Sequence, residues 1–313
     1  MASKFNIPDF DEFMISENQS GERKNRRSGF GKQDALNFAH PVDARIIKVL
    51  DNKVVNELFE KYVDASVDLS MGLALSSSVK VSETTNPEIY NMIKDCAEKL
   101  NIPIPYTVIS SSVKGINAQT AGTDEFPFIA VSSLLTALFN EEEQKFVLWH
   151  ECGHIALGHV VYHTAISTIG TLGSLVPIVG SVLASTIHFP LNAWSRRSEI
   201  SADRAGLICC GDLRTAKRSL LRLEAGFMNI DNIDIDEYLD NSIRFRKNNS
   251  LGKFTELFNE HPIIPKRIEL LELFANSKKY YRCIGKPIPS RTHLIDDDEL
   301  EKKTESIIKV IGW

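Results

Sequence analysis

Residue types that can bind and activate a metal ion are concentrated at positions 147–159, which read V-L-W-H-E-C-G-H-I-A-L-G-H. His150 and His154 are four residues apart, so both imidazoles project from one face of a helix and can hold a single Zn²⁺ ion. Glu151 lies between them, where a general base for a metal-activated water is needed. The same pattern also arises in helices that carry two ordinary histidines, so a second signal is required.

A second motif lies at positions 194–207, W-S-R-R-S-E-I-S-A-D-R-A-G-L. A catalytic zinc ion needs three protein ligands and one open position, and Glu199 can be the third ligand. Asp203 follows four residues later on the same helix face and can accept the outer ring N–H of a ligand histidine. Alternatively, the two carboxylates pair with Arg196 or Arg204 on a solvated helix. The two motifs together predict a catalytic zinc site with one ion per chain.

Helices are expected to present both motifs. Apolar residues recur at intervals of three and four over 40–62 and again over 89–100, as one buried helix face requires. Further helices are predicted over 141–163, 194–210, 215–227 and 265–275.

Two short segments read as strands, 106–110 and 126–131, and 117–122 reads as a short extended stretch between them. Both predicted strands are rich in β-branched or aromatic residues. The strand at 128–131 either pairs with an extended peptide at a sheet edge or lies in the interior of the sheet.

The two metal motifs together resemble the HtpX and CAAX prenyl endopeptidase family of zinc metallopeptidases, within the gluzincins. The resemblance runs from about residue 40 to residue 274. It implies an α+β fold, a predominantly helical zincin-type metallopeptidase domain with a small antiparallel or mixed sheet. Two shorter elements also match: N-A-x-x-x-G at Asn117, Ala118 and Gly122, and H-P-x-x-x-x-R-I at His261, Pro262, Arg267 and Ile268.

The resemblance also implies a role for each matched residue. His150, His154 and Glu199 would bind zinc, and Glu151 would be the general base of peptide-bond hydrolysis. His261 is a candidate to stabilise the oxyanion, or else a helix-start histidine ahead of Pro262 with a structural role. The N-A element implies substrate-binding roles for Asn117 and Ala118.

The sequence divides into three parts. Residues 1–34 are expected to be a flexible N-terminal tail, because they combine a basic cluster with few apolar residues over 16–32. Residues 35–284 are expected to form the metallopeptidase domain, and 285–313 a C-terminal extension that ends in one short helix.

One segment of the expected domain is unusually apolar. No Asp, Glu, Lys or Arg occurs between Glu151 and Arg196. Two membrane crossings need about 40 apolar residues, and only 44 residues separate His154 from Glu199, which must meet at one metal. We therefore expect 165–190 to form an apolar hairpin or a cap over the cleft. The chain is expected to be cytoplasmic, either soluble or in peripheral contact with a membrane through this segment.

The composition limits the classes of binding partner and the compartments that suit this chain. The 313 residues carry a net charge of −5, which does not favour a nucleic-acid partner. Five scattered cysteines fit a reducing compartment. Nothing in the sequence assigns an oligomeric state.

Two functions are compatible with these features. The first is a zinc-dependent endopeptidase that acts on a peptide or protein substrate. The second is a non-proteolytic binding or scaffold protein that retains the zinc fold. The intact Glu151 beside intact ligands favours the endopeptidase.

Overall fold

The computed structural model describes residues 37–41, 77–122, 126–164, 189–226, 230–248, 261–290 and 293–309. The elements in these ranges belong to one compact unit, Ala35–Trp313. The tail predicted at 1–34, nearly all of the helix predicted at 40–62 and most of the apolar segment at 165–190 lie outside the described residues.

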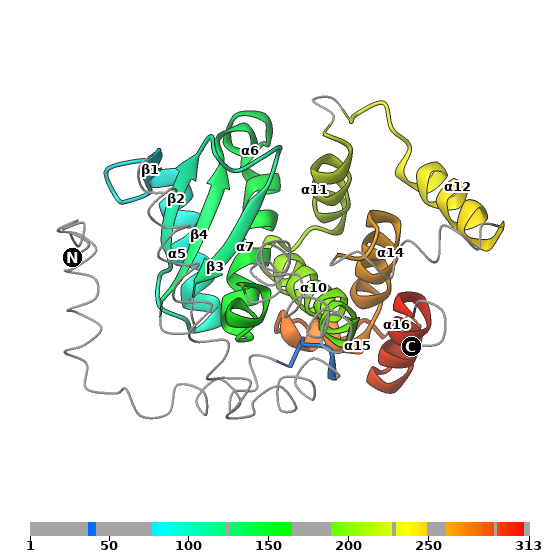
Figure 1. The fold of residues 1–313 in the computed structure, drawn as a ribbon. Helices are drawn as coiled ribbons and strands as arrows, with labels where there is room; N and C mark the ends of the chain where they lie inside the picture. Colours follow the sequence, from blue (N-terminus) through cyan, green and yellow to red (C-terminus); the bar gives the residue numbers. More distant parts are fainter. Residues whose placement is uncertain are drawn as a thin grey trace, which may run out of the picture. The chain divides into compact units, whose positions relative to one another are not determined.

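A small mixed sheet forms the first half of the described fold (Figure 1). Its order is β1-β2-β4-β3; β2 and β4 run parallel, while β1 and β3 are antiparallel to their neighbours. The small sheet of the predicted α+β fold is therefore confirmed, although β1 was not foreseen. The strands are β1 (Ser78–Lys80), β2 (Tyr106–Ser110), β3 (Ala118–Gly122) and β4 (Pro127–Ser132).

The strand order decides between the two interpretations of residues 128–131. These residues belong to β4, which is paired on both sides, with β2 and with β3. The edge interpretation was therefore wrong for this strand, and the interior one is correct. On this side of the sheet the edge strand is β3.

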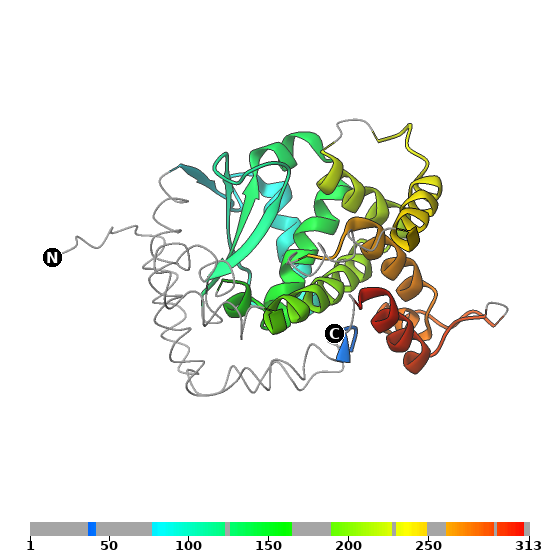
Figure 2. The same ribbon diagram turned by 45° about the vertical axis from the view of Figure 1, so that its right-hand side comes forward.

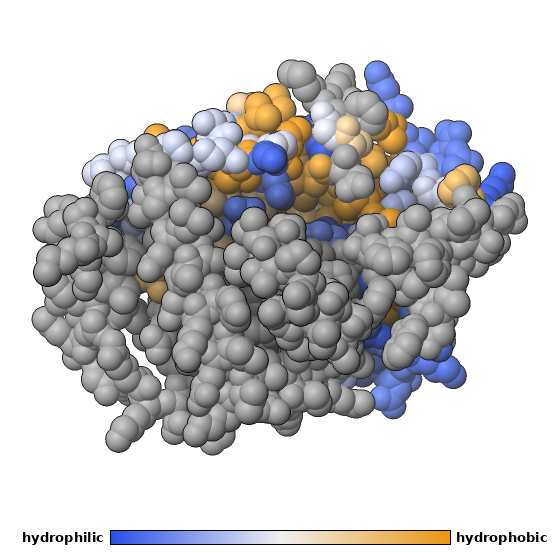
Figure 3. All heavy atoms as spheres, viewed as in Figure 1, coloured by the Kyte–Doolittle hydropathy of each residue, from blue (hydrophilic) through white to orange (hydrophobic). Residues whose placement is uncertain are grey.

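Two long helices lie along one face of the sheet, α5 (Pro87–Leu100) and α7 (Glu141–Ala156) (Figure 1). The Trp149 indole N–H donates to the Met92 carbonyl at 2.6 Å and joins them. The short helix α6 (Ser133–Leu138) connects β4 to α7. In the space-filling view, hydrophobic residues gather at the upper margin over α6, where Leu134 is 49% exposed (Figure 3).

Helix α7 has well-defined ends. At its start, Asn140 and Glu143 form a capping box, in which each side chain accepts from the other residue's backbone N–H. The helix was predicted to continue to His163, but it ends at Ala156. Gly158 has a φ of +70°, in the left-handed region that terminates helices, and the chain turns there.

The second half of the described fold is helical (Figure 2). Helix α14 is its centre, because it contacts α10, α11, α12, α15 and α16. None of the helices in the described ranges is long and apolar enough to cross a membrane. The elements are α10 (Phe189–Cys210), α11 (Leu213–Ala225), α12 (Ile235–Asn248), α14 (Ile264–Ala275), α15 (Lys278–Cys283) and α16 (Asp297–Ile308).

The last helix, α16, falls within the part predicted as a C-terminal extension. It packs on α14, and its Leu300 side chain is fully buried. Glu301 of α16 forms a paired contact with the Arg204 guanidinium of α10, at 3.0 and 3.1 Å. Residues 297–308 are thus attached to the helix that carries the second metal motif.

Candidate metal centre

Two imidazole nitrogens and the two oxygens of one carboxylate, all from the two motifs, converge in the buried space between α7 and α10. His150 Nε2 lies 3.1 Å from His154 Nε2 and 3.5 Å from Glu199 Oε2. His154 Nε2 lies 3.2 Å from Glu199 Oε1. A tetrahedral ion with bonds of about 2.0–2.1 Å keeps its ligand atoms roughly 3.3 Å apart. The three donors therefore have the spacing that one zinc ion requires.

Glycine allows the two helices to come this close. A Cβ atom built on Gly153 of α7 would lie only 2.8 Å from the Ala205 Cβ of α10. In the same way, a Cβ on Gly206 of α10 would lie 2.9 Å from the Phe146 ring of α7. Both glycines belong to the metal motifs, and larger residues there would push Glu199 away from the histidines.

Asp203 forms a hydrogen bond with Nδ1 of His150, the ring nitrogen that is not a proposed ligand atom. Its Oδ1 lies 3.0 Å from His150 Nδ1, so a protonated Nδ1 donates to the carboxylate and leaves Nε2 free for a metal. Asp203 is in turn bound by the Arg267 guanidinium, through Nε at 2.8 Å and Nη2 at 2.6 Å. Burial raises the pKa of Asp203, but the charge and hydrogen bonds of Arg267 hold that pKa below its usual value.

The charges around the three donors also suit a cation. Glu199 and Asp203 are buried carboxylates, and among the described residues Arg267 is the guanidinium that contacts both. Glu151 adds a third buried carboxylate nearby. Buried charges need partners, and a divalent ion between the donors would balance this excess of negative charge. Two histidines and one glutamate are also a ligand set of catalytic zinc sites, so the residues fit zinc.

Without a metal, the two histidines differ in proton affinity. Burial lowers the pKa of His150, but hydrogen bonds to Asp203 and Glu199 outweigh burial and raise it to about 10. Burial dominates at His154 and lowers its pKa. Burial also raises the pKa of Glu199, yet the charge of His261 and hydrogen bonds from the histidines hold it well below its usual range.

Glu151 points from the metal helix towards the edge strand. Its Oε2 accepts a 2.6 Å hydrogen bond from the Thr120 hydroxyl of β3. Sequence reasoning did not identify Thr120, although it lies inside the matched N-A-x-x-x-G element. Within that element, Asn117 is exposed directly before β3, and Ala118, the first residue of β3, is buried.

His261 lies at the rim of the centre. Its Nδ1 is 3.0 Å from Glu199 Oε2, while its side chain is 60% exposed. The element that contains His261 and Arg267 therefore contacts both acidic residues of the second motif. Arg204 binds Glu301 instead of Asp203, so the alternative pairing of Asp203 with Arg204 was wrong.

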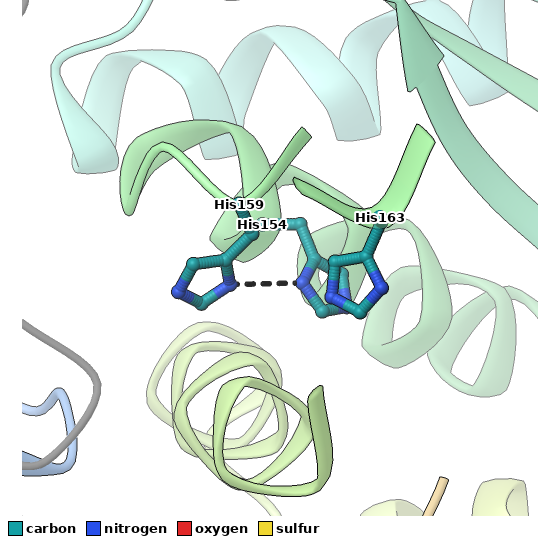
Figure 4. Close-up of side chains that lie close together, drawn as sticks. All are labelled: His154, His159 and His163. Carbon is teal, nitrogen blue, oxygen red and sulfur yellow. Dashed lines mark hydrogen bonds between the residues drawn. The ribbon is translucent and has the colours of Figure 1, made fainter. Parts of the chain in front are cut away.

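Two further histidines lie beside the predicted ligands (Figure 4). His159 Nδ1 is 3.0 Å from His154 Nδ1, and the His163 ring is 4.8 Å from the His154 ring. Ligand atoms of His154, His159 and His163 are close enough together to form a second potential metal group that shares His154. The spacing H-x-x-x-x-H-x-x-x-H could have indicated this cluster, but the sequence interpretation did not use it.

Comparisons with known proteins find metallopeptidases among the relatives of this chain. A family model described as peptidase family M48 matches residues 83–274. The plastoglobule-localized metallopeptidase 48 of Arabidopsis thaliana is 29% identical over 227 residues, 71% of this chain and 65% of that protein. The match thus spans less than two thirds of that relative. A protease HtpX homolog of Ralstonia nicotianae is 26% identical over 239 residues, 67% of this chain and 82% of that protein. No solved structure matches the chain.

Proposed function

The chain belongs to peptidase family M48, and we propose from this premise that it is a zinc-dependent endopeptidase acting on a peptide or protein substrate. One observation carries the proposal: His150 Nε2, His154 Nε2 and a Glu199 oxygen converge at zinc-ligand spacing, with Glu151 adjacent. A scaffold protein would have no chemical need for an intact general base beside the ligands. Zinc held by these residues would polarise the scissile carbonyl and make a water molecule acidic enough to react near neutral pH.

Glu151 performs the proton transfers. Its Oε2 accepts the Thr120 hydrogen bond, so we assign Oε1 to take a proton from the attacking water. The same carboxylic acid then delivers that proton to the leaving amine, and the carboxylate is restored. The Thr120 hydrogen bond fixes the orientation of the carboxylate through both steps.

His261 is assigned to the developing oxyanion. Its Nδ1 contacts Glu199 at 3.0 Å, and its side chain is 60% exposed, so a substrate can reach the ring. An imidazole N–H near the attacked carbonyl would stabilise the negative charge as it develops. A structural role ahead of Pro262 is the competing assignment. His261→Ala distinguishes them, because loss of an oxyanion donor lowers kcat while zinc content and the melting temperature are retained.

The edge strand β3 is assigned to substrate binding. An extended peptide can add to an exposed sheet edge by backbone hydrogen bonds, and β3 is the edge strand nearest Glu151. Because the Ala118 side chain is buried, its contribution would come from the backbone, whereas the exposed Asn117 side chain can contact the peptide directly.

We place the protein in the cytoplasm, with peripheral contact to a lipid surface through 165–190. The absence of Asp, Glu, Lys and Arg between Glu151 and Arg196 supports this contact. The Arabidopsis relative carries the name of a plastoglobule-localized protein. Alkaline carbonate should extract the wild-type chain from membranes, and resistance to carbonate would contradict a peripheral contact.

The proposed activity is tested by casein cleavage with purified full-length protein. Wild type should contain about one zinc per chain and cleave casein. Glu151→Gln should keep the zinc and lose turnover. Glu142→Gln is the matched control, since it makes the same change at an exposed position of the same helix. Equal cleavage by wild type and Glu151→Gln would refute the assignment of the base.

A further inference from the structure

A buried histidine outside the proposed ligand set contacts one of the ligands. His159 is fully buried, and its Nδ1 lies 3.0 Å from Nδ1 of His154 (Figure 4). We propose that His159 is a positioning residue that fixes the ring orientation and tautomer of His154 for metal binding. This inference rests on the zinc centre of the proposed function.

The direction of the hydrogen bond follows from the ligand geometry. His154 Nε2 faces His150 and Glu199, so Nε2 must carry the lone pair that a metal needs. A neutral imidazole holds one proton, which then lies on Nδ1. His154 Nδ1–H therefore donates, and His159 Nδ1 accepts. His159 is thus required as the neutral tautomer with its proton on Nε2.

The turn after α7 places the His159 ring at this distance. The left-handed conformation of Gly158 follows the end of α7, and the His159 backbone N–H donates to the His154 carbonyl at 2.9 Å. The Trp194 indole of α10 packs edge-on against the His159 ring, with centroids 5.5 Å apart. Backbone and ring are both constrained, as a positioning residue requires.

The two predicted histidine ligands consequently have different partners. His150 is oriented by the Asp203 carboxylate, which is itself bound by Arg267. His154 is oriented by a neutral imidazole. Because its acceptor carries no charge, His159 adds no further buried anion to a centre that already holds Glu199 and Asp203. Outer partners of metal-binding histidines typically change metal affinity by about 10- to 100-fold when they are removed.

A second metal ion is the competing use of this cluster. His154, His159 and His163 are grouped closely enough to hold one, but His154 has a single lone pair, and its Nε2 is directed at the first centre. His163 Nε2 instead lies 2.8 Å from the Ser198 hydroxyl. A metal in this cluster would have to remove His154 from the first centre, so the geometry favours positioning.

Variants that move only the hydrogen-bond acceptor test this proposal. In His159→Asn the Oδ1 atom can occupy the place of Nδ1, whereas in His159→Gln the acceptor lies one bond further out, near the place of Nε2. His159→Leu removes the acceptor. His163→Leu is the matched control, because its ring also contacts His154 while its hydrogen bond goes to Ser198. Zinc affinity of each full-length chain is measured by competition with a chelator, and the absorption of the Co²⁺ form reports ligand geometry.

His159→Leu and His159→Gln should bind zinc about 10- to 100-fold more weakly than wild type and change the Co²⁺ spectrum. His159→Asn and His163→Leu should stay within about threefold of wild type. If His159→Leu does not fold, the zinc affinities of His159→Asn and His159→Gln still show whether the position of the acceptor matters.

Equal affinities of His159→Asn and His159→Gln would overturn the proposal. So would a second zinc equivalent in wild type that both His159→Leu and His163→Leu lose, because the cluster would then be a metal site. Wild type that binds no zinc would refute the proposed function itself. That result is read from wild type alone and is distinct from a failure confined to the His159 variants.

Discussion

Replacing Gly153 with alanine would place a methyl group between the two helices that carry the proposed zinc ligands. The new Cβ atom would lie 2.8 Å from the Ala205 Cβ, whereas ordinary contacts between such atoms begin near 3.4 Å. Both atoms belong to helices packed in the interior, so neither can rotate away. Helix α10 would have to move outward by roughly 0.6 Å or more to relieve the overlap.

This displacement is large for a metal site. Zinc–ligand distances are normally kept within about 0.2 Å, and Glu199 is carried by the helix that must move. We expect Gly153→Ala to lower the free energy of unfolding of the metal-free chain by about 1–3 kcal/mol, the usual cost of overpacking. Zinc affinity should also fall, because Glu199 moves away from His150 and His154.

Denaturant unfolding of the metal-free chain and chelator competition measure the two effects. The double variant Gly153→Ala, Ala205→Gly removes the methyl group that the new Cβ meets, so it should recover much of the zinc affinity. Zinc binding by Gly153→Ala at wild-type affinity would refute the idea that close helix packing sets the ligand spacing. Failure of the Ala205→Gly change to restore binding would refute it as well.

Three further predictions concern other parts of the molecule. Asp203→Asn should weaken zinc binding by about 10- to 100-fold in chelator competition without unfolding the chain, because an amide orients His150 less well. Thr120→Val should lower kcat for casein roughly tenfold through loss of a hydrogen bond to the charged Glu151, while Thr120→Ser should keep most activity. Burial lowers the pKa of His40 to about 4, so the unfolded chain gains a proton near pH 6.5 that the folded chain gains only near pH 4. His40 should therefore contribute a fall in stability of about 2 kcal/mol from pH 7 to pH 5, and His40→Gln should reduce the fall measured by denaturant unfolding by this amount.

The features that sequence reasoning recovered are local in the chain. The pairs His150–His154 and Glu199–Asp203 are each one helical turn apart, so periodicity alone places each pair on one face. The strand at 106–110 was predicted with its observed bounds, because β-branched residues follow two prolines there. The family resemblance and the helical α+β fold are confirmed, whereas the roles of the individual site residues stay predictions.

The features that it missed depend on contacts between distant segments. Thr120 and Glu151 are 31 residues apart, and Arg267 and Asp203 are 64 apart. No local pattern connects such pairs. The sequence left open whether β4 lies at an edge or in the interior, because alternation of side chains does not determine strand order. The position of His159 depends on the left-handed turn at Gly158, and there the apolar pattern wrongly favoured a continuous helix.

Anomalous diffraction at the zinc absorption edge, from crystals of the zinc-loaded full-length chain, tests the central claim most directly. We expect one peak, within about 2.0–2.2 Å of His150 Nε2, His154 Nε2 and a Glu199 oxygen, with the Glu151 carboxylate adjacent. A peak at a zinc ion coordinated instead by His159 and His163 would contradict the proposed centre. So would the absence of a peak among His150, His154 and Glu199 in crystals that contain zinc.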